Sequence, residues 1–437
     1  MISFFITWLI VPFFWLFLLQ KAELSVFKIT IPSFLFCSML IFQYIGFPIL
    51  YLQTDEYRAE FVNNYQTLNQ TFIYSILATS LLLLGFIIGR KICGKLNWAT
   101  KNKKIKNQKK RQKNIIILFG IICIFLLINY ISIIGVKNTA LSLIFEIKTA
   151  SEIAFLRSEM ANSFPGNYVW HKIFFRSVLL VVVVFFLNEI LLQPRSILNW
   201  LCFVSFSSFF AASSFMTAEK GPAVYGVLTC MVGLLWLKNN GCISFKTSLI
   251  FGSIILGSLL VSYLIFMGAS DLWSSFNGII SRALTGQLQA TYHYVENFPT
   301  TFSFLGGTSL PNPGKIFPFT PFNLTQELSA YVFPEDAKNN IVGSMPSVFW
   351  VEIYANFGLV ACLLASMVVG VFLYLINFLI FQLPYTSLSI AFFSWTVVHY
   401  SELSITFSSN YWIDLKMLII GTLIFFIQIS TYKKCKK

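Results

Sequence analysis

The sequence predicts an all-α, polytopic membrane protein with about eleven transmembrane helices. Of its 437 residues, 57% are hydrophobic, only 11% are charged and 48 are phenylalanine. The mean hydropathy is +0.74, and soluble domains contain only about 45 to 50% apolar residues. The apolar residues also gather in windows that approach the roughly 20 residues a helix needs to cross a bilayer. We therefore expect a single integral membrane domain over residues 1–437.

Eleven windows meet this length or come close to it. In lipid, each backbone N–H and C=O of such a span must be paired within its own helix. Residues 353–401 contain no charge and are too long for one span, and Gln382-Leu383-Pro384 divides them because proline does not continue a helix. The predicted spans are 2–19, 31–52, 71–89, 115–134, 173–192, 197–215, 221–237, 247–267, 357–381, 385–401 and 411–431.

The basic residues predict the topology. Cytoplasmic loops are rich in Lys and Arg, and segment 90–114 contains 11 basic residues. With this loop in the cytoplasm, alternation of the spans puts 20 of the 31 basic residues on that side, against two of the 17 acidic ones. We expect the N-terminus outside, the C-terminus inside, and a solvated basic loop close to anionic lipid.

The longest connections, 135–171 and 268–345, open on the outer side. The second contains 78 mostly polar residues interrupted by Pro and Gly. We expect this loop to be partly helical, with a helix over 276–297. Because the long polar loops all open on the outer face of the membrane, we expect the functional site to lie on that face.

Several kinds of chemistry lack their sequence signals. There is no Walker loop, no G-x-G-x-x-G motif after a strand, and no D-x-D pair for a metal and a nucleotide-sugar. The eight cysteines fall in spans or cytoplasmic segments, which predicts no disulfide framework. The three histidines lie far apart in sequence, so no metal site and no cofactor are predicted. The sequence shows no internal repeat, and this weakens the interpretation as a transporter built of paired halves.

The positive signals are basic residues at the outer membrane boundary. These are Arg157 in an amphipathic segment 146–160, Arg176 and Lys220 at span ends, and Arg282 in the long loop. Taken singly, each has an ordinary alternative, because such side chains snorkel to headgroups, remain solvated or pair with acids. Several cations on one face favour an anion such as pyrophosphate, whose oxygens arginine grips bidentately.

The long loop also offers a polar helical face. Arg282, Gly286, Gln289 and His293 follow spacings of 4, 3 and 4, which place them on one side of the predicted helix. His293 is a candidate general base for a hydroxyl proton. Glu352, at the outer start of a span, is the second candidate base, because placing a carboxylate there costs free energy and suggests a function. An ion pair with a nearby cation would explain Glu352 equally well.

Further motifs follow Arg282. They are Tyr292, Glu296-Asn297-Phe298-Pro299, Gly306-Gly307, a proline-rich passage, Gly343-Ser344-Met345-Pro346 and Tyr354-Ala355-Asn356-Phe357-Gly358. Together with the turn Glu219-Lys220-Gly221-Pro222, they resemble Wzy-type O-antigen and oligosaccharide repeat-unit polymerases of the C-type glycosyltransferase superfamily. The resemblance covers most of the chain as topology.

This resemblance implies a metal-independent polysaccharide polymerase in the bacterial inner membrane, with its N-terminus periplasmic and its C-terminus cytoplasmic. Such enzymes join undecaprenyl-pyrophosphate-linked oligosaccharides on the periplasmic face, as in lipopolysaccharide biosynthesis, and release undecaprenyl pyrophosphate. Arg282 would stabilise the departing charge, and Glu352 or His293 would be the base. A chain-length regulator is a further partner that the family implies, and nucleic acid is not expected. The residues expected to bind pyrophosphate or sugar are Arg157, Arg176, Lys220, Arg282, Gln289 and Tyr292.

The chain departs from the family pattern in two places. Some members carry a glycine eleven residues after each of two loop arginines, whereas Tyr168 and His293 stand at those distances from Arg157 and Arg282. The related O-antigen ligases carry a histidine shortly before a Glu-x-Gly near the last spans, whereas segment 340–358 has none. The second departure disfavours a ligase.

Two other interpretations stay open. Another lipid-linked glycosyltransferase is suggested by Asp55-Glu56 in the first long outer loop, although a solvated loop face explains this acidic pair more simply. The other is a non-enzymatic lipid-oligosaccharide flippase or transporter. That function calls for charges along a path through the bilayer, and the predicted spans are nearly free of charge.

Overall fold

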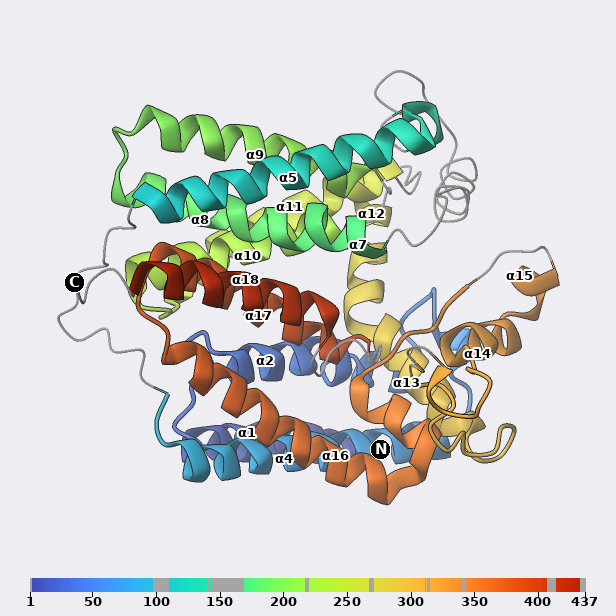
Figure 1. Ribbon diagram of the computed structural model, residues 1–437. Coiled ribbons are helices and arrows are strands. Elements are labelled where there is room, and N and C mark those ends of the chain that lie inside the picture. The colour runs from blue at the N-terminus through green and yellow to red at the C-terminus, as the bar shows by residue number, and fades with distance from the viewer. Residues whose placement is uncertain are drawn as a thin grey trace. The chain divides into compact units, whose positions relative to one another are not determined.

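In the computed structural model, every regular element among the described residues is a helix (Figure 1). The structure describes residues 2–96, 110–139, 142, 169–216, 220–266, 271–310, 312, 315–338, 343–406 and 414–432. Within these ranges, eight helices are long and apolar enough to cross a membrane by length and composition. The protein is therefore an all-α, multi-pass membrane protein, as the sequence predicts.

The eight helices correspond to eight of the predicted spans. The other three predicted spans, 247–267, 385–401 and 411–431, fall on α11 (Phe245–Phe266), α17 (Ser387–Ser401) and α18 (Leu415–Tyr432). The predicted break at Pro384 is confirmed, because α16 (Phe349–Phe381) ends before it and α17 begins after it.

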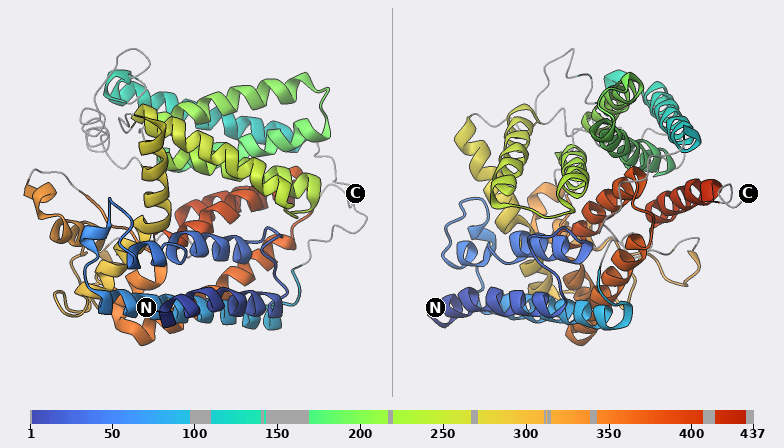
Figure 2. Two further views of the ribbon diagram at one scale, coloured as in Figure 1. Left: turned by 180° about the vertical axis from the view of Figure 1, so that it is seen from behind. Right: turned by 90° about the vertical axis from the view of Figure 1, so that its left-hand side faces the viewer.

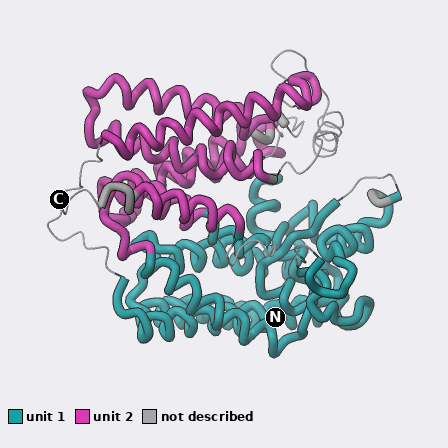
Figure 3. Tube along the Cα trace, viewed as in Figure 1, with its two compact units in different colours: residues 1–96, 277–379, 399–414 teal, residues 97–276, 380–398, 415–437 magenta. Residues whose placement is uncertain are grey.

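The chain forms two compact units (Figure 3). Unit 1 contains residues 1–96, 277–379 and 399–414, and unit 2 contains residues 97–276, 380–398 and 415–437. The single membrane domain expected over residues 1–437 stays a prediction.

Unit 1 contains long apolar helices that lie side by side in the lower part of Figure 1. The cap residues Thr30 and Asn64 start two of them, because each side chain accepts hydrogen bonds from backbone N–H groups of the first turn. These helices are α1 (Ile2–Lys21), α2 (Ile31–Gln43) with α3 (Phe47–Tyr51), α4 (Tyr65–Cys93) and most of α16.

The long polar segment 268–345 is partly helical, as predicted, but its first helix begins earlier than expected. Helical turns run without interruption through α12 (Leu272–Ile280), the π-helix η5 (Ser281–Thr285) and α13 (Gly286–Asn297). The predicted start at 276 is wrong because the carboxylate of Asp271 accepts the N–H of Ser274 at 2.7 Å and starts the helix there. Arg282 therefore lies within this helical run, in its π-helical turn.

The remainder of this segment forms only short helices separated by non-helical chain. It contains α14 (Leu324–Val332) and α15 (Pro334–Lys338) before α16 begins. Gly358 interrupts α16 with φ 78° and ψ −176°, a backbone conformation that favours glycine. The predicted start of the span at 357 coincides with this interruption, so residues 349–357 form a separate helical segment at the N-terminal end of α16.

The two ends of α4 differ in chemistry. At the C-terminal end, Glu23 pairs with Arg90, and with Nζ of Lys95 at 3.0 Å. At the N-terminal end, the N–H of Asn64 donates to the hydroxyl of Tyr292 on α13 at 3.1 Å. The 29 residues of α4 separate these ends by roughly 40 Å, at about 1.5 Å per residue. Helix α13 is therefore attached to the end of α4 that lies far from the basic cluster.

Helices α4 and α16 approach each other at two glycines. A Cβ on Gly85 would lie 2.2 Å from the carbonyl oxygen of Met367, and a Cβ on Gly370 would lie 2.2 Å from that of Leu82. In a bilayer, helices associate through close packing, and small residues let their backbones touch. The two helices are thus held backbone to backbone.

Replacing Gly85 with alanine is expected to destabilise unit 1 by about 1–3 kcal/mol, because the added methyl group forces two backbones apart. Thermal unfolding of the purified protein in detergent measures the change. Gly252→Ala is the matched control, since a Cβ at Gly252 has no atom within 4 Å. Equal shifts of Tm in the two variants would contradict the close packing of α4 and α16.

Unit 2 contains the remaining apolar helices. The end-on view in Figure 2 shows α5, α8 and α9 as a bundle, and these helices contact one another. Ser387 ties α17 to α8, since its hydroxyl donates to Glu189 at 2.6 Å and its carbonyl accepts from Asn188 at 3.2 Å. Besides α11, α17 and α18, the helices are α5 (Lys110–Ile134), α7 (Val169–Lys172), the π-helix η4 (Ile173–Val178), α8 (Leu179–Leu192), α9 (Ile197–Phe215) and α10 (Lys220–Asn239).

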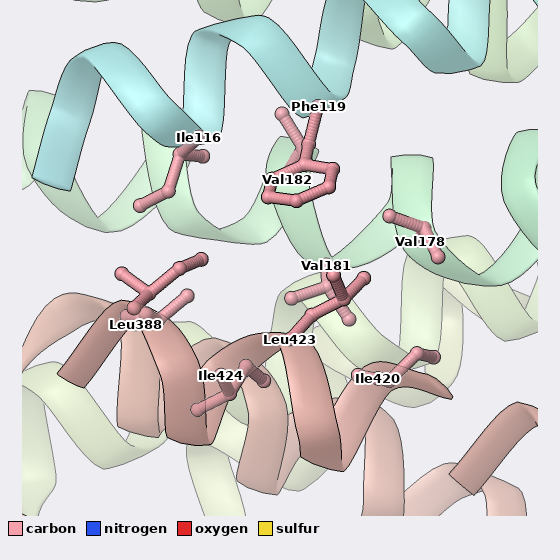
Figure 4. A pocket seen from close by; sticks show the side chains of 10 residues that line it. Ile116, Phe119, Val178, Val181, Val182, Leu388, Ile420, Leu423 and Ile424 are labelled. Atoms are coloured by element: carbon pink, nitrogen blue, oxygen red, sulfur yellow. The ribbon is translucent and has the colours of Figure 1, made fainter. Parts of the chain in front are cut away.

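An apolar hollow lies within unit 2, among α5, α8, α17 and α18 (Figure 4). Its lining side chains are all hydrocarbon, so they offer no polar atom to a ligand. The hollow therefore belongs to the packing of unit 2 and contributes no candidate chemistry. The lining residues are Ile116, Phe119, Val178, Val181, Val182, Leu388, Ile420, Leu423, Ile424 and Ile427.

Candidate functional site

The predicted site residues are divided between the two units. Arg176 lies in η4 and Lys220 begins α10, both in unit 2. Arg157 and the segment 146–160 lie outside the described residues. The candidate site is built from the predicted residues of unit 1. They are Arg282, Gln289, Tyr292, His293 and Glu352.

One face of α13 is fixed to the rest of unit 1. The Thr291 hydroxyl makes hydrogen bonds of 2.8 Å with Oε1 of Gln43 and with the hydroxyl of Ser347. The Tyr294 hydroxyl donates to the carbonyl of Met345 at 3.1 Å. Burial raises the pKa of Tyr294, and the negative charge of a nearby carboxylate raises it further, so this hydroxyl remains a donor. These bonds fix the rotation of α13.

The opposite face of α13 receives an arginine that the sequence did not predict there. Nη1 of Arg58 donates to Oε1 of Gln289 at 2.5 Å, and Nε donates to the hydroxyl of Ser281 at 3.2 Å. A Cβ on Gly286 would lie 3.4 Å from Cζ of Arg58 and 3.4 Å from Cδ of Arg282. Two arginine side chains therefore pass the bare backbone of Gly286, and that of Arg282 is exposed.

Asp55 anchors the loop that carries Arg58. Its carboxylate accepts hydrogen bonds from the Thr285 hydroxyl and, at 3.0 Å, from the N–H of Tyr57. Only 7% of Asp55 is exposed, whereas the neighbouring Glu56 is exposed. The interpretation of Asp55 as part of a solvated loop face is wrong, because Thr285 binds it in the interior. With both oxygens bonded inside the protein, Asp55 positions Arg58 and is poorly placed to act as a base.

A histidine, a carboxylate and a tyrosine form a hydrogen-bonded group on α13. Nδ1 of His293 lies 3.1 Å from Oε2 of Glu296, and the Tyr292 hydroxyl donates to Oε1 of Glu296 at 2.6 Å. Burial raises the pKa of Tyr292, and its bond to Glu296 raises it further. Burial also favours neutral Glu296, but the hydrogen bonds from His293 and Tyr292 outweigh this effect and lower the pKa of Glu296. Glu296 is therefore an ionised acceptor shared by two donors.

Two buried polar atoms of α13 have no hydrogen-bond partner within the described structure. They are Nε2 of Gln289 and Nε2 of His293, on residues one helical turn apart. The exposed fractions of these residues are 1% and 5%. Unpaired buried polar atoms are rare in native proteins, because each has lost its hydration without replacement. Of the two, the Gln289 side chain lies next to Arg58, whose Nη1 donates to its Oε1, and His293 follows one helical turn further along α13.

Glu352 lies on the other side of α13. Its Oε1 accepts the backbone N–H of Ser347 at 3.3 Å, and Ser347 in turn meets Thr291, on the face of α13 that points away from His293. Glu352 is 7% exposed and helps to hold the chain at the start of α16. Of the two bases that the sequence proposes, His293 is the one whose ring nitrogen Nε2 has no hydrogen-bond partner among the described residues.

Three of the motifs behind the family resemblance contact one another in unit 1. The N–H of Gly306 donates to the carbonyl of Asn356 at 2.9 Å, and the N–H of Gly307 donates to Oδ1 of the same residue at 3.1 Å. Both glycines have positive φ, 60° and 97°, which explains the residue type. The Tyr354 hydroxyl donates to the carbonyl of Phe298 at 2.8 Å. These motifs therefore hold the C-terminal end of α13 against α16.

No family model matches the chain, and no curated protein or solved structure matches it either. The class that the fold defines is a multi-pass membrane protein, and its candidate site is the face of α13 that carries Gln289 and His293.

Proposed function

We propose that the protein is a membrane-bound glycosyltransferase that polymerises undecaprenyl-pyrophosphate-linked oligosaccharide repeat units of an O-antigen or related surface polysaccharide. The observation that carries this proposal is the shared face of α13. It combines Arg58 and Arg282 with a histidine whose Nδ1 is bonded to Glu296 and whose Nε2 has no partner in the described part of the chain. Two guanidinium groups suit a pyrophosphate leaving group, and the histidine suits the hydroxyl of the attacking sugar.

The position of this face supports a periplasmic site. It adjoins the end of α4 that lies roughly 40 Å from the cluster of Arg90, Lys95 and Glu23, at about 1.5 Å per residue. Basic residues favour the cytoplasmic side of a bacterial inner membrane. With that cluster in the cytoplasm, the N-terminus of the chain would be periplasmic and the C-terminus cytoplasmic.

The chemistry is a displacement at a sugar carbon. The hydroxyl of a new repeat unit attacks C1 of the reducing sugar of the growing chain. The bond from C1 to the pyrophosphate oxygen breaks, and its electron pair leaves with undecaprenyl pyrophosphate. Arg58 and Arg282 stabilise that charge as it develops, and the hydroxyl proton passes to His293. Arg157, Arg176 and Lys220 stay predicted as further ligands of the pyrophosphate.

The direct test supplies purified protein with lipid-pyrophosphate repeat units and no added metal. Wild-type protein is expected to release undecaprenyl pyrophosphate and to form polymer ladders, and Arg282→Ala is expected to abolish the ladders without loss of expression. Unchanged ladders in that variant, or a requirement for metal, would overturn the mechanism. A single transfer without ladders would favour a ligase or another lipid-linked glycosyltransferase. Movement of the lipid across vesicles without release would favour a flippase.

A further inference from the structure

We infer that Nε2 of Gln289 and Nε2 of His293 together bind one hydroxyl group of the acceptor sugar, and that Glu296 positions His293 for this task. This inference rests on the proposed function and deepens it, because it names the substrate group that each atom contacts.

The hydrogen-bond roles of the two atoms follow from their neighbours. Nδ1 of His293 faces the ionised carboxylate of Glu296, which only accepts hydrogen bonds, so Nδ1 carries the proton. In the neutral ring, Nε2 is then an acceptor. Oε1 of Gln289 already accepts from Arg58, so its unpaired Nε2 is an amide donor. The face therefore presents one donor and one acceptor, on residues one helical turn apart.

This pairing selects a chemical class. A hydroxyl group accepts one hydrogen bond and donates another, so a single hydroxyl can satisfy both atoms. A fully ionised phosphate oxygen only accepts, and an apolar group does neither. The arginines beside Gly286 favour the phosphate, and Gln289 with His293 favours the hydroxyl. Along α13, the arginines beside Gly286 would therefore form an anion subsite, and Gln289 with His293 would form an adjoining hydroxyl subsite.

Glu296 is itself held from two sides. Its Oε1 accepts the Tyr292 hydroxyl at 2.6 Å, and that hydroxyl accepts the N–H of Asn64 at the start of α4. This arrangement leaves Oε2 to fix the ring of His293. As the new bond to C1 forms, the hydroxyl O–H bond breaks and its proton moves to Nε2 of His293. Glu296 remains ionised and stabilises the resulting imidazolium.

The kinetic test replaces Glu296 with glutamine, which keeps the size of the side chain and removes its charge. The expected result is a kcat for undecaprenyl pyrophosphate release that falls by about 10- to 100-fold, with KM for the repeat unit unchanged. Glu327→Gln, at an exposed position on α14, is the matched control and should behave as wild type. Gln289→Leu is expected to raise KM by about tenfold, because it removes one hydrogen bond to the acceptor.

The second readout needs no activity. The chain contains only three histidines, so nitrogen-15 NMR of histidine-labelled protein can follow each ring, and His293→Gln identifies the signal of His293. Wild-type protein is expected to show Nδ1 protonated and Nε2 bare, and Glu296→Gln is expected to show a mixture of the two tautomers. An unchanged tautomer in this variant would overturn the role of Glu296.

The possible failures are distinguishable. If wild-type protein forms no ladders, the proposed function is wrong, and the assignment of a sugar hydroxyl fails with it. If wild-type protein forms ladders and Glu296→Gln keeps the wild-type kcat, the inference is wrong and the proposed function survives. If Gln289→Leu keeps the wild-type KM, the two atoms hold water only, and the hydroxyl subsite is wrong.

Discussion

Replacement of His293 with glycine is expected to slow polymer formation by about 10²- to 10⁴-fold, the usual contribution of a positioned general base. The sugar hydroxyl would then have to lose its proton to water. Added imidazole is expected to restore part of the rate, because the vacated space lies beside Glu296, which would orient the added ring as it orients His293. The initial rate of undecaprenyl pyrophosphate release is the measurement.

His171→Ala is the control for this variant, because His171 lies in α7 of unit 2 and has no proposed role in the reaction. A wild-type rate in His293→Gly would contradict the assignment of His293 as the base. A slow variant that imidazole fails to rescue, together with a lowered Tm, would indicate that the loss comes from unfolding.

Replacement of Arg58 with alanine is expected to lower kcat by about 10²- to 10³-fold, as the loss of a preorganised donor to developing negative charge does in other enzymes. Arg58→Lys is expected to recover only part of this loss. Lysine keeps the positive charge, but it lacks the rigid fork that contacts Gln289 and Ser281 together. Undecaprenyl pyrophosphate release again measures the effect.

The control for Arg58 is Arg195→Ala, at an exposed position between α8 and α9. This variant removes the same charge from the chain and should keep the wild-type rate. If Arg58→Ala also keeps it, the anion subsite does not include Arg58, and its guanidinium would serve only to pack the loop onto α13.

Composition and spacing predict much of the fold, because a span must be long and apolar wherever it lies in the chain. The same local reasoning places Gly286, Gln289 and His293 on successive turns of one helix. It does not find Arg58, whose role depends on a contact across 231 positions of sequence. In the sequence, the acidic pair is the conspicuous feature of the segment Asp55-Glu56-Tyr57-Arg58, whereas in the structure its arginine contacts Gln289 and Ser281.

The hydrogen bonds of Glu352 and Asp55 also depend on contacts that sequence spacing does not reveal. A carboxylate near a span is a functional candidate because its removal from water costs free energy. Only the folded structure shows which hydrogen bonds compensate for this loss of hydration. Glu352 is occupied by a backbone N–H of Ser347, and Asp55 by Thr285 and Tyr57. His293 differs from both, because one of its polar atoms is left without a partner among the described residues.

The glycine contact between α4 and α16 has a mechanical consequence for α13. The start of α4 is hydrogen-bonded to Tyr292, and the segment that leads into α16 is hydrogen-bonded to Thr291. The two helices therefore hold α13 from two sides. Because Gly85 and Gly370 join these helices backbone to backbone, they form a stiff frame. A bilayer that changes thickness would then tilt both helices as one piece. We therefore expect the hydrogen bond between Glu296 and His293 to be insensitive to the thickness of the surrounding bilayer.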